Sequence, residues 1–372
     1  MRQHLRMRVQ DGGCLEVVDP DWASLPLLRA IDPRFRVRRL PLPGFHRPRI
    51  LETLATQLPA TKAALASLSE EELWRLHDSA MSGAATAPKS AISPSAASTL
   101  LDVKRELASR LAGPCRLCAR RCGVDRRHGE HGTCGLGMAG VVAEHFTHVA
   151  EEPPINPSLL ISLAGCGLRC KACQQGPLLA PASVAGRDLG PDLWRDLDFT
   201  RARSLSFAGG NPDESLPAIL GFLAGMPHDF RLPIAWNCHA YSTPEVLALL
   251  AGVVDVWVPD LKYGSATCGS KWSSVASYPQ QALAAVQAML KQDVPVFVRL
   301  LVLPGHFECC HRPALRALAE IAGQEQLHVR ISGQYAPDWK VTEGDGGMAR
   351  RPQANEIAAA VALAKSLGLK LI

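Results

Sequence analysis

The sequence predicts an α/β fold for the larger, C-terminal part of the chain, built from parallel strands and the helices that connect them. From about residue 155, short apolar runs typical of strands alternate with longer amphipathic stretches typical of helices. Such alternation implies parallel strands joined by right-handed crossovers. At roughly 35 residues per unit, the segment 151–372 holds about six βα units. A full barrel needs eight units, so a partial barrel and an open doubly wound sheet are the two alternatives.

Six expected strands and five expected helices follow one another along this segment. The strands are LLISLAG, SLSFAGG, LPIAWN, VVDVWVPDL, VPVFVRLLVL and LHVRISGQY. The helices are expected at residues 213–226, 243–252, 278–292, 312–323 and 355–368. Thr243 as N-cap and Pro244 at the first helical position mark the start of the second helix.

Three further segments precede this fold. Residues 1–78 form an N-terminal extension of unknown role that we expect to be mainly helical, and Ser69 three residues before Glu72 predicts a capping box within it. Residues 79–100 are small, polar and interrupted by proline, which favours a flexible linker. Residues 101–150 form a Cys-rich metal-binding segment, in which the basic, Gly-rich stretch 115–135 favours a loop held by its ligands.

The composition excludes several classes of protein. The 372 residues are 47% hydrophobic and 20% charged, which is ordinary for a globular protein. The net charge of +5 is spread along the chain, so we expect neither a nucleic acid partner nor a membrane. No apolar run reaches the roughly 18 residues of a spanning helix, and the first residues lack the apolar core of a signal peptide. We therefore expect a cytoplasmic, thiol-reducing location, where twelve cysteines suggest metal ligation.

The strongest chemical signal is GCGLRCKAC, which follows the first expected strand. Cys166, Cys170 and Cys173 have the spacing Cys-x3-Cys-x2-Cys, so their thiolates can reach three corners of one iron–sulfur cluster. Such clusters normally take four thiolates, and a three-thiolate site leaves one iron open to a ligand from outside the protein. An open iron suits catalysis better than electron storage. A zinc site and three unconnected thiols are the alternatives.

A second group of cysteines lies upstream, with the spacing Cys-x2-Cys-x3-Cys-x11-Cys. It contains Cys115, Cys118, Cys122 and Cys134. Four ligands close a site, which therefore holds either a second iron–sulfur cluster or a structural zinc ion. Nearby guanidinium groups would offset the anionic charge of the thiolates, and we expect them from Arg116, Arg120 and Arg121.

The three-cysteine motif at the end of the first strand of a six-unit α/β barrel resembles the radical S-adenosylmethionine superfamily. FAGGNPDES at 207–215, AWNCHAYSTPEVL, VVDVWVPDLKYG, VFVRLLVLPG and ISGQYAP resemble the ends of the second to sixth strands. Together with CRLCARRCGVDR and GTCG upstream, they are similar to the group related to pyruvate formate-lyase-activating enzyme, a group of uncharacterised iron–sulfur proteins. The resemblance covers about residues 98–372 and implies a partial (β/α)6 TIM-like barrel.

This resemblance implies a catalytic 4Fe–4S cluster on the three motif cysteines, with S-adenosylmethionine bound to the open iron. One-electron reduction, from a donor such as flavodoxin or ferredoxin, would yield a 5′-deoxyadenosyl radical. The radical would abstract hydrogen from a protein, peptide or small-molecule substrate. A glycyl-radical-enzyme activase is one alternative within this class. A non-catalytic iron–sulfur or zinc protein is the alternative outside it.

The resemblance also implies which residues contact the cofactor: Gly209, Gly210, Asn211, Asn237, Asp260 and Lys262. The two glycines would let the backbone approach the methionine amino group, although a simple turn is the other interpretation. Asn211 stands where most relatives have an acid. Lys262 would contact the cofactor carboxylate and Asp260 a ribose, cation or substrate group, unless the two form a surface ion pair.

Four residues are candidates for the substrate side: His239, Arg299, Gln334 and Tyr335. His239 is either a proton carrier or a structural histidine, and an inward-pointing Arg299 would suit a carboxylate. Relatives usually carry His at the position of Leu300 and, across the superfamily, an aromatic residue at that of Ala172. The segment GHFECCH at 305–311 can bind metal, but we favour a plain loop because adjacent cysteines rarely ligate one ion. Cys14 and Cys268 stay unassigned.

Overall fold

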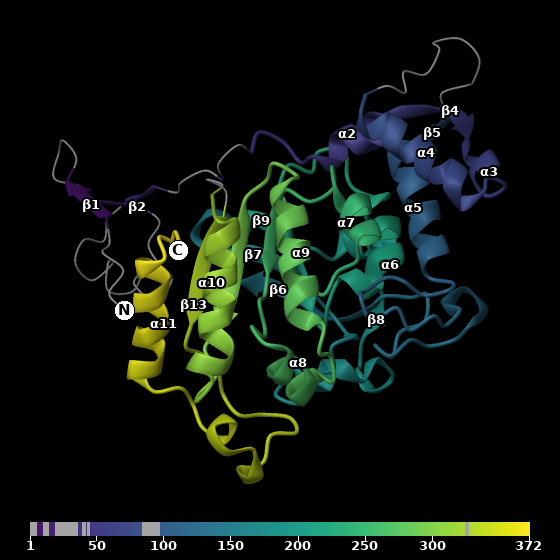
Figure 1. Cartoon of the computed structure of the whole chain (residues 1–372). Helices are drawn as coiled ribbons and strands as arrows, with labels where there is room; N and C mark the ends of the chain where they lie inside the picture. Colours follow the sequence, from purple (N-terminus) through teal and green to yellow (C-terminus); the bar gives the residue numbers. More distant parts are fainter. Residues whose placement is uncertain are drawn as a thin grey trace.

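The computed structural model describes residues 45–83, 97–323 and 327–372, residue 42, and the backbone of residues 6–9, 15–18 and 36–38. At its centre is a mixed sheet of eight strands in the order β13-β12-β11-β10-β9-β7-β6-β8 (Figure 1). Six consecutive members pair in parallel: β7 (Ser158–Leu163), β9 (Ser204–Gly209), β10 (Ile234–Cys238), β11 (Val256–Pro259), β12 (Val296–Leu301) and β13 (Leu327–Ser332).

These six strands are the six expected from the sequence, so an α/β fold with a mostly parallel sheet is confirmed. Their order along the sheet is also their order along the chain, which is what successive right-handed crossovers produce. The curvature of a partial barrel stays a prediction. Two antiparallel strands, β6 (Val141–His148) and β8 (Arg187–Asp188), extend the sheet beyond β7 and were not expected.

The expected helices are present between the strands. They are α6 (Leu216–Leu223), α7 (Pro244–Leu250), α9 (Tyr278–Leu290), α10 (Arg312–Ile321) and α11 (Ala354–Ser366). Thr243 caps α7 by accepting a hydrogen bond from the Val246 backbone, as predicted. A short helix, α8 (Ala266–Ser273), was not expected. The crossover from β7 to β9 contains no α-helix; it holds β8 and the 3-10 turns η4 (Gly176–Leu179), η5 (Pro181–Ser183) and η6 (Pro191–Arg195).

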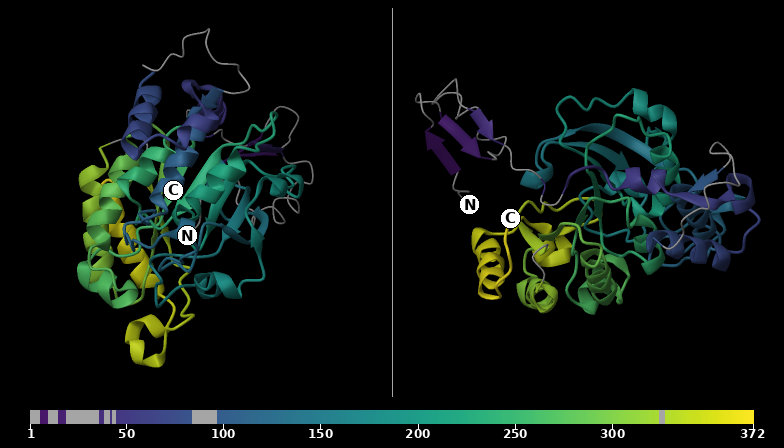
Figure 2. Two further views of the ribbon diagram at one scale, coloured as in Figure 1. Left: turned by 90° about the vertical axis from the view of Figure 1, so that its right-hand side faces the viewer. Right: turned by 90° about the horizontal axis from the view of Figure 1, so that it is seen from above.

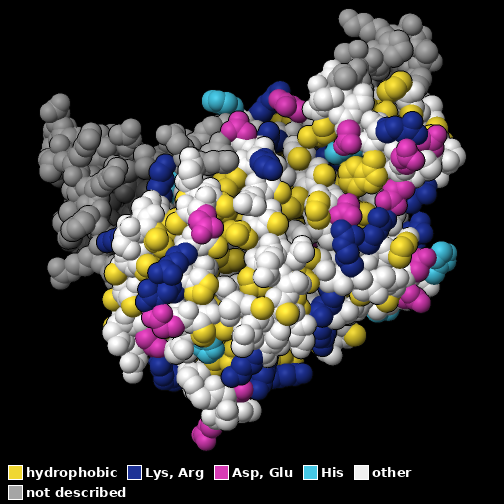
Figure 3. Space-filling model, in the orientation of Figure 1, with side chains coloured by type: hydrophobic (Ala, Val, Ile, Leu, Met, Phe, Trp, Pro, Cys, Tyr) yellow, Lys and Arg dark blue, Asp and Glu magenta, His cyan; other side chains and the backbone are white. Residues whose placement is uncertain are grey.

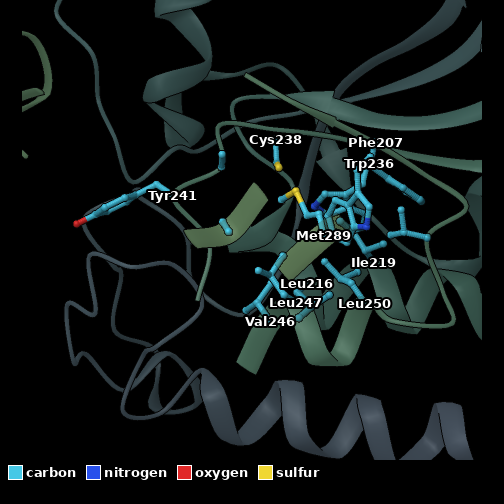
Figure 4. Close-up of a cluster of buried hydrophobic side chains, with 14 of the residues drawn as sticks. Phe207, Leu216, Ile219, Trp236, Cys238, Tyr241, Val246, Leu247, Leu250 and Met289 are labelled. Atoms are coloured by element: carbon cyan, nitrogen blue, oxygen red, sulfur yellow. The ribbon is translucent and has the colours of Figure 1, made fainter. Parts of the chain in front are cut away.

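Helices α9, α10 and α11 lie side by side along one face of the sheet, as Figure 2 shows from above. Beneath the helices, Phe207 of β9 and Trp236 of β10 pack with ring centroids 5.7 Å apart. Figure 4 shows Ile219 of α6, Leu250 of α7 and Met289 of α9 gathered around them. This core fixes the ends of the strands, where the chemical residues lie.

The opposite face of the sheet carries a smaller apolar cluster that includes Ala235, Val258 and Phe297. Side chains alternate along a strand, so Asn237 and Arg299 lie on the same face as this cluster. Trp236, which packs on the helices, lies on the other face.

The N-terminal part contains more strand than we expected. Strands β1 (Arg6–Val9), β2 (Leu15–Val18) and β3 (Arg36–Arg38) form a separate sheet. Helices α2 (Ile50–Ala55), α3 (Lys62–Leu65) and α4 (Glu70–Met81) follow, and the predicted capping box of Ser69 and Glu72 is present at α4. The expected linker ends before β5 (Ala97–Thr99), because β5 pairs with β4 (Gln57–Thr61). Residues 84–96 lie outside the described residues.

Helix α5 (Leu100–Leu111) joins the two parts, since it packs against α4 on one side and against α6 and α7 on the other. Its Lys104 is fully buried and donates to the Ala251 carbonyl at the end of α7 over 2.9 Å. The segment boundaries at residues 78, 100 and 150 stay predictions.

The surface shown in Figure 3 mixes side chains of both charges. Within the described part of the chain, no helix combines the length and the apolar character needed to cross a membrane.

Candidate metal and cofactor site

The loop that carries the Cys-x3-Cys-x2-Cys motif begins at the carboxyl end of β7. Gly165 there has φ of +89°, and a Cβ would lie 2.6 Å from the Leu136 side chain, so the turn requires glycine. Cys166 is buried, whereas Cys170 and Cys173 are partly exposed. The loop thus presents one thiol inward and two toward the surface.

Each thiol of the loop accepts a hydrogen bond. The backbone N–H groups of Leu168 and Arg169 donate to Cys166, and that of Gln175 donates to Cys173 Sγ over 3.4 Å. The Ser273 hydroxyl, at the end of α8, lies 3.0 Å from Cys170 Sγ.

These contacts fit a metal cluster. Burial raises the pKa of Cys166 and of Cys173, so their thiolates need positive charge to form, and a bound cluster supplies it. N–H···S hydrogen bonds are among the features that tune iron–sulfur sites. The three thiols therefore fit a 4Fe–4S cluster by donor type and by hydrogen bonding.

The end of β9 packs directly against this loop. Gly210 donates to the Leu163 carbonyl over 2.6 Å, and a Cβ on Gly210 would lie 2.1 Å from the Gly165 oxygen. Gly209 has φ of +102°, a conformation that favours glycine. Both glycines are thus required by the close approach of two chain segments, whatever they do for a cofactor.

Glu214, which we did not identify from the sequence, occupies the centre of the site. Its carboxylate accepts from the Gly167 backbone over 2.7 Å and from the Asn211 amide, and lies 3.4 Å from His239 Nε2. Burial raises the pKa of this carboxyl, but His239 and the hydrogen bonds outweigh burial and hold it below its ordinary value. The sequence contained one signal for it, the second acid of NPDES.

Asn211 and His239 are engaged by this arrangement. Asn211 Oδ1 accepts from the His239 backbone over 3.0 Å while its amide donates to Glu214. His239 Nδ1 accepts from the Tyr241 backbone over 3.1 Å, so a neutral ring carries its proton on Nε2, which faces Glu214. Both side chains are buried, and the geometry suits the structural interpretation of His239.

The upstream cysteines lie against the same carboxylate. A Cβ on Gly167 would be 2.9 Å from Cys118 Sγ and 2.8 Å from a Glu214 oxygen. A Cβ on Gly132 would lie 3.3 Å from the sulfurs of both Cys122 and Cys134, so these sulfurs are at most twice that distance apart. The stretch is irregular apart from one 3-10 turn, as expected for a ligand-held loop.

One cation beside the upstream group, Arg126, was not expected, whereas the expected Arg120 donates to the carbonyls of Gly167 and Ser273. Arg126 Nη1 lies 4.0 Å from Cys115 Sγ and donates to the Glu214 carbonyl over 2.8 Å. The side chains of Arg116 and Arg121 instead form ion pairs with glutamates. Arg126 was missed because its contact depends on how the loop folds back on itself.

Asp260 and Lys262 follow β11 and pair with each other over 2.6 Å. Burial opposes the charge on Lys262, but the Asp260 carboxylate outweighs burial and raises the lysine pKa. Thiolates at Cys170 and Cys173 would raise the lysine pKa as well. The ion pair that we kept as an alternative is present.

Asn237, at the end of β10, is partly exposed and makes no side-chain hydrogen bond within the described residues. Its amide can therefore bind a ligand without breaking an existing contact. Tyr263 is a further neighbour of the loop that we missed: its hydroxyl lies 2.9 Å from the Ser273 hydroxyl that contacts Cys170.

The remaining substrate candidates separate into engaged and exposed residues. Arg299 donates to the buried carboxylate of Glu152, over 2.8 and 2.7 Å, and to that of Glu151. The Tyr335 hydroxyl donates to the Met348 carbonyl over 2.8 Å. Gln334 is exposed, and its carbonyl accepts from Gln174, which follows the motif, over 3.3 Å.

Comparison with known proteins finds one informative relative. No protein-family model matches the chain. The uncharacterized protein MJ0674 of Methanocaldococcus jannaschii is 30% identical over 283 residues, which span 73% of this chain and 80% of that protein.

Several solved structures are also similar. A domain of pyruvate-formate lyase-activating enzyme from Bacteroides vulgatus matches 45% of this chain and 97% of its own, at 16% identity and a TM-score of 0.34. Streptococcus suis SuiB bound to S-adenosylmethionine matches 56% of this chain and 47% of its own, at 13% identity and a TM-score of 0.39. The same enzyme bound to its precursor peptide SuiA gives a TM-score of 0.40 at 14% identity.

Proposed function

This chain belongs to the family of the uncharacterized protein MJ0674, and from that premise we propose that it is a radical S-adenosylmethionine enzyme. One observation carries the proposal. The three motif cysteines stand in one loop at the carboxyl end of β7, where the thiols of Cys170 and Cys173 are partly exposed and the end of β9 packs against the loop through Gly210. A set of three thiols that is open on one side suits a cluster with one free iron.

Cys166, Cys170 and Cys173 would hold the 4Fe–4S cluster. When bound and reduced, this cluster supplies the electron that cleaves S-adenosylmethionine to a 5′-deoxyadenosyl radical, which then abstracts hydrogen from the substrate. The chain's own part is to orient the thiols. Glu214 does so by holding the Gly167 backbone, and Ser273 does so by contacting Cys170.

Lys262 and Asn237 are the side chains that we propose to contact S-adenosylmethionine. Lys262 carries a positive charge at the end of β11 and suits the cofactor carboxylate, with Asp260 holding the ammonium in place over 2.6 Å. Asn237 has an unengaged amide on the face of the sheet that carries Ala235 and Phe297. Gly209, Gly210 and Asn211 stay predictions as cofactor contacts, because their visible role is to hold the loop.

We further propose that the six parallel strands curve into a partial barrel and that the substrate is a protein, peptide or small molecule. All cysteines in the described part of the chain are free thiols, which supports a reducing, cytoplasmic location. The cluster would then take electrons from a donor such as flavodoxin or ferredoxin. A second cluster or a zinc ion would occupy the upstream cysteines.

The test is anaerobic reconstitution of the full chain with iron and sulfide, followed by dithionite and S-adenosylmethionine. We expect 5′-deoxyadenosine from the wild type and only background from Cys166→Ala/Cys170→Ala/Cys173→Ala. Cys14→Ala, whose cysteine lies outside the described residues, is the control and should match the wild type. A fully loaded wild type that leaves S-adenosylmethionine intact would refute the proposal and favour a non-catalytic iron–sulfur protein.

A glycyl-radical activase is the narrower alternative. It requires that the chain, when loaded and reduced, generate a glycyl radical on a partner enzyme, which electron paramagnetic resonance detects. The buried carboxylates around Arg299 do not favour a particular substrate.

A further inference from the structure

A group of three cysteines and one histidine stands apart from the proposed cluster sites. Cys268 lies on α8, whereas His306, Cys309 and Cys310 belong to the segment between β12 and α10, which forms the π-helical turn η8 (Phe307–His311). In the sequence we left Cys268 unassigned and favoured a plain loop at 305–311. The structure instead brings Cys268, 37 to 43 residues upstream, into contact with that segment.

We propose that Cys268, Cys309, Cys310 and His306 bind one divalent, thiophilic metal ion with the chemistry of Zn²⁺. The ligand atoms of Cys268, Cys309 and His306 all lie within 4.8 Å of one another. Three thiolates and one imidazole are a donor set that structural zinc sites use. The inference does not depend on the proposed function, because zinc binding needs neither a cluster nor S-adenosylmethionine.

The spacing of the two sulfurs suits a shared ion. Cys268 Sγ and Cys309 Sγ are 3.7 Å apart. Two sulfurs on a tetrahedral ion with bonds of about 2.3 Å are separated by roughly 3.8 Å. A disulfide would instead need about 2.05 Å. The pair therefore has the separation of two ligands on one ion rather than that of a bridge.

His306 is oriented as a metal ligand. Its Nδ1 lies 2.8 Å from the Pro304 carbonyl, which fixes the ring proton on that nitrogen and leaves the Nε2 lone pair for another partner. Ligating histidines commonly donate their second nitrogen to a backbone carbonyl in this way. The Trp272 indole now donates to Nε2 over a long 3.3 Å, a contact that an ion would replace.

Cys310 is the fourth ligand that we propose; its sulfur is not among the ligand atoms that lie within 4.8 Å of one another, so it would move toward the ion on binding. Its thiol hydrogen-bonds with that of Cys268 and accepts from the Gly264 backbone over 3.1 Å. A Cβ on Gly264 would lie 2.0 Å from the Cys310 oxygen, so glycine is required for this approach. Cys268 contacts both Cys309 and Cys310. The two adjacent cysteines can therefore both reach an ion bound at Cys268. Cys309 is exposed, which gives the ion a path of entry.

Such an ion would tie α8 to the connection between β12 and α10. The far end of α8 touches the cluster loop, since Ser273 lies 3.0 Å from Cys170 Sγ and the Trp272 carbonyl accepts from the Lys171 backbone over 2.7 Å. An ion at this site would therefore hold α8 in position against the loop that carries Cys170.

The test measures zinc bound to the full-length protein. Chelator-treated wild type, Cys268→Ser/Cys309→Ser and Glu308→Gln are each loaded with Zn²⁺, freed of excess, and assayed for metal per chain. Glu308 lies in the same turn and pairs with Arg312 rather than with the thiols, so Glu308→Gln is a matched control. We expect the double variant to hold one zinc ion fewer than the other two proteins, whatever metal the upstream group binds. His306→Ala should weaken zinc binding by about 10–100-fold.

Equal zinc in all three proteins would overturn the proposal, as would a reconstituted wild type that differs from the double variant in iron and sulfide rather than in zinc. A second measurement uses the wild type alone, so it tests the proposal even if the double variant misfolds. Zinc should protect Cys268 and Cys309 of the wild type from alkylation, as read by peptide mass spectrometry. Alkylation of both at the same rate with and without zinc would also overturn it.

Discussion

The two groups of thiols that meet at Glu214 use the same ligand in different surroundings. In the upstream group, Cys115, Cys118 and Cys134 are at most 7% exposed. Cys122 of that group is partly exposed. In the motif loop, Cys166 is buried, whereas Cys170 and Cys173 are partly exposed. Buried, fully ligated metal sites stabilise folds, whereas sites with an accessible position carry out chemistry. The difference in accessibility therefore supports our proposal of a structural metal at the upstream group and a reactive one at the motif loop.

The largest expected effect comes from removing thiols on each side of Glu214. Cys118→Ser/Cys134→Ser should lower the free energy of unfolding by more than about 5 kcal/mol, because structural metal binding contributes to folding directly. Cys170→Ser/Cys173→Ser should instead abolish S-adenosylmethionine cleavage while changing the free energy of unfolding by only about 1 kcal/mol. Denaturant unfolding and 5′-deoxyadenosine assays measure the two quantities. Equal destabilisation by both pairs would erase the distinction between the groups.

Glu214 tests whether the two groups depend on one carboxylate. Glu214→Gln replaces an acceptor with an amide that must face the donors of Gly167 and Asn211. We expect a loss of about 3 kcal/mol in unfolding free energy, since buried donors lose their partner. We also expect weaker iron incorporation at the motif loop.

Iron content after reconstitution and denaturant unfolding check the Glu214 prediction. The exposed Glu308→Gln is the control. If Glu214→Gln loads iron normally and unfolds like the wild type, the carboxylate is not shared by the two groups.

The ion pairs of Arg299 with Glu151 and Glu152 should make the stability of the sheet sensitive to acid, independently of the thiol groups. Burial raises the pKa of Glu151, but Arg299 and His148 outweigh it and lower the pKa to about 2 from an ordinary value of 4.5. The unfolded chain binds a proton to this group more readily than the folded protein does, so its contribution is complete above pH 4.5 and is lost as the pH falls toward 2. The loss amounts to about 3 kcal/mol at most.

Urea unfolding of metal-free protein at pH 5 and pH 3 measures this contribution. Glu151→Gln should reduce the difference between the two pH values. Glu356→Gln is a matched second variant, because the ion pair with Arg350 also lowers the pKa of Glu356 to about 2. An unchanged acid response in Glu151→Gln would assign the acid sensitivity to other groups.

The smallest expected effect concerns the open side of the motif loop. Lys262→Met keeps the length of the side chain but removes its charge, so it should weaken S-adenosylmethionine binding about tenfold, or about 1.4 kcal/mol. The unfolding free energy should change little, because both partners of the Asp260 pair are partly exposed. Isothermal titration of the reconstituted protein with S-adenosylmethionine provides the measurement. Wild-type affinity would show that the charge of Lys262 does not serve the cofactor.

The sequence predicted the parallel part of the fold because the strands are short runs rich in apolar residues, and most of them are followed by a helix with its own period. It did not predict β6, whose sequence VVAEHFTH mixes charged and apolar residues along a partly exposed edge of the sheet. Helix α8 was missed as well, because ATCGSKWS contains a glycine and too few apolar residues to show a helical period.

For the site, spacing identified both cysteine groups, since their ligands are close in sequence. Glu214, Ser273 and Cys268 were missed because their partners lie 41 to 103 residues away, and only the folded chain brings them together. Arg299 was a candidate for the substrate side, but its carboxylate partners, Glu151 and Glu152, come from a segment before β7 and could not be foreseen.

The contact between Gly165 and Gly210 has a consequence for comparing relatives. No side chain fits on Gly210 while the Gly165 carbonyl stands where its Cβ would be. Selection for folding alone will therefore retain this glycine, even in a descendant that has lost the reaction. Asn237 has no such structural duty among the described contacts. In relatives that no longer bind the proposed cofactor, we expect Asn237 to be replaced before Gly210. Asn237 is therefore the better marker for distinguishing active from inactive relatives.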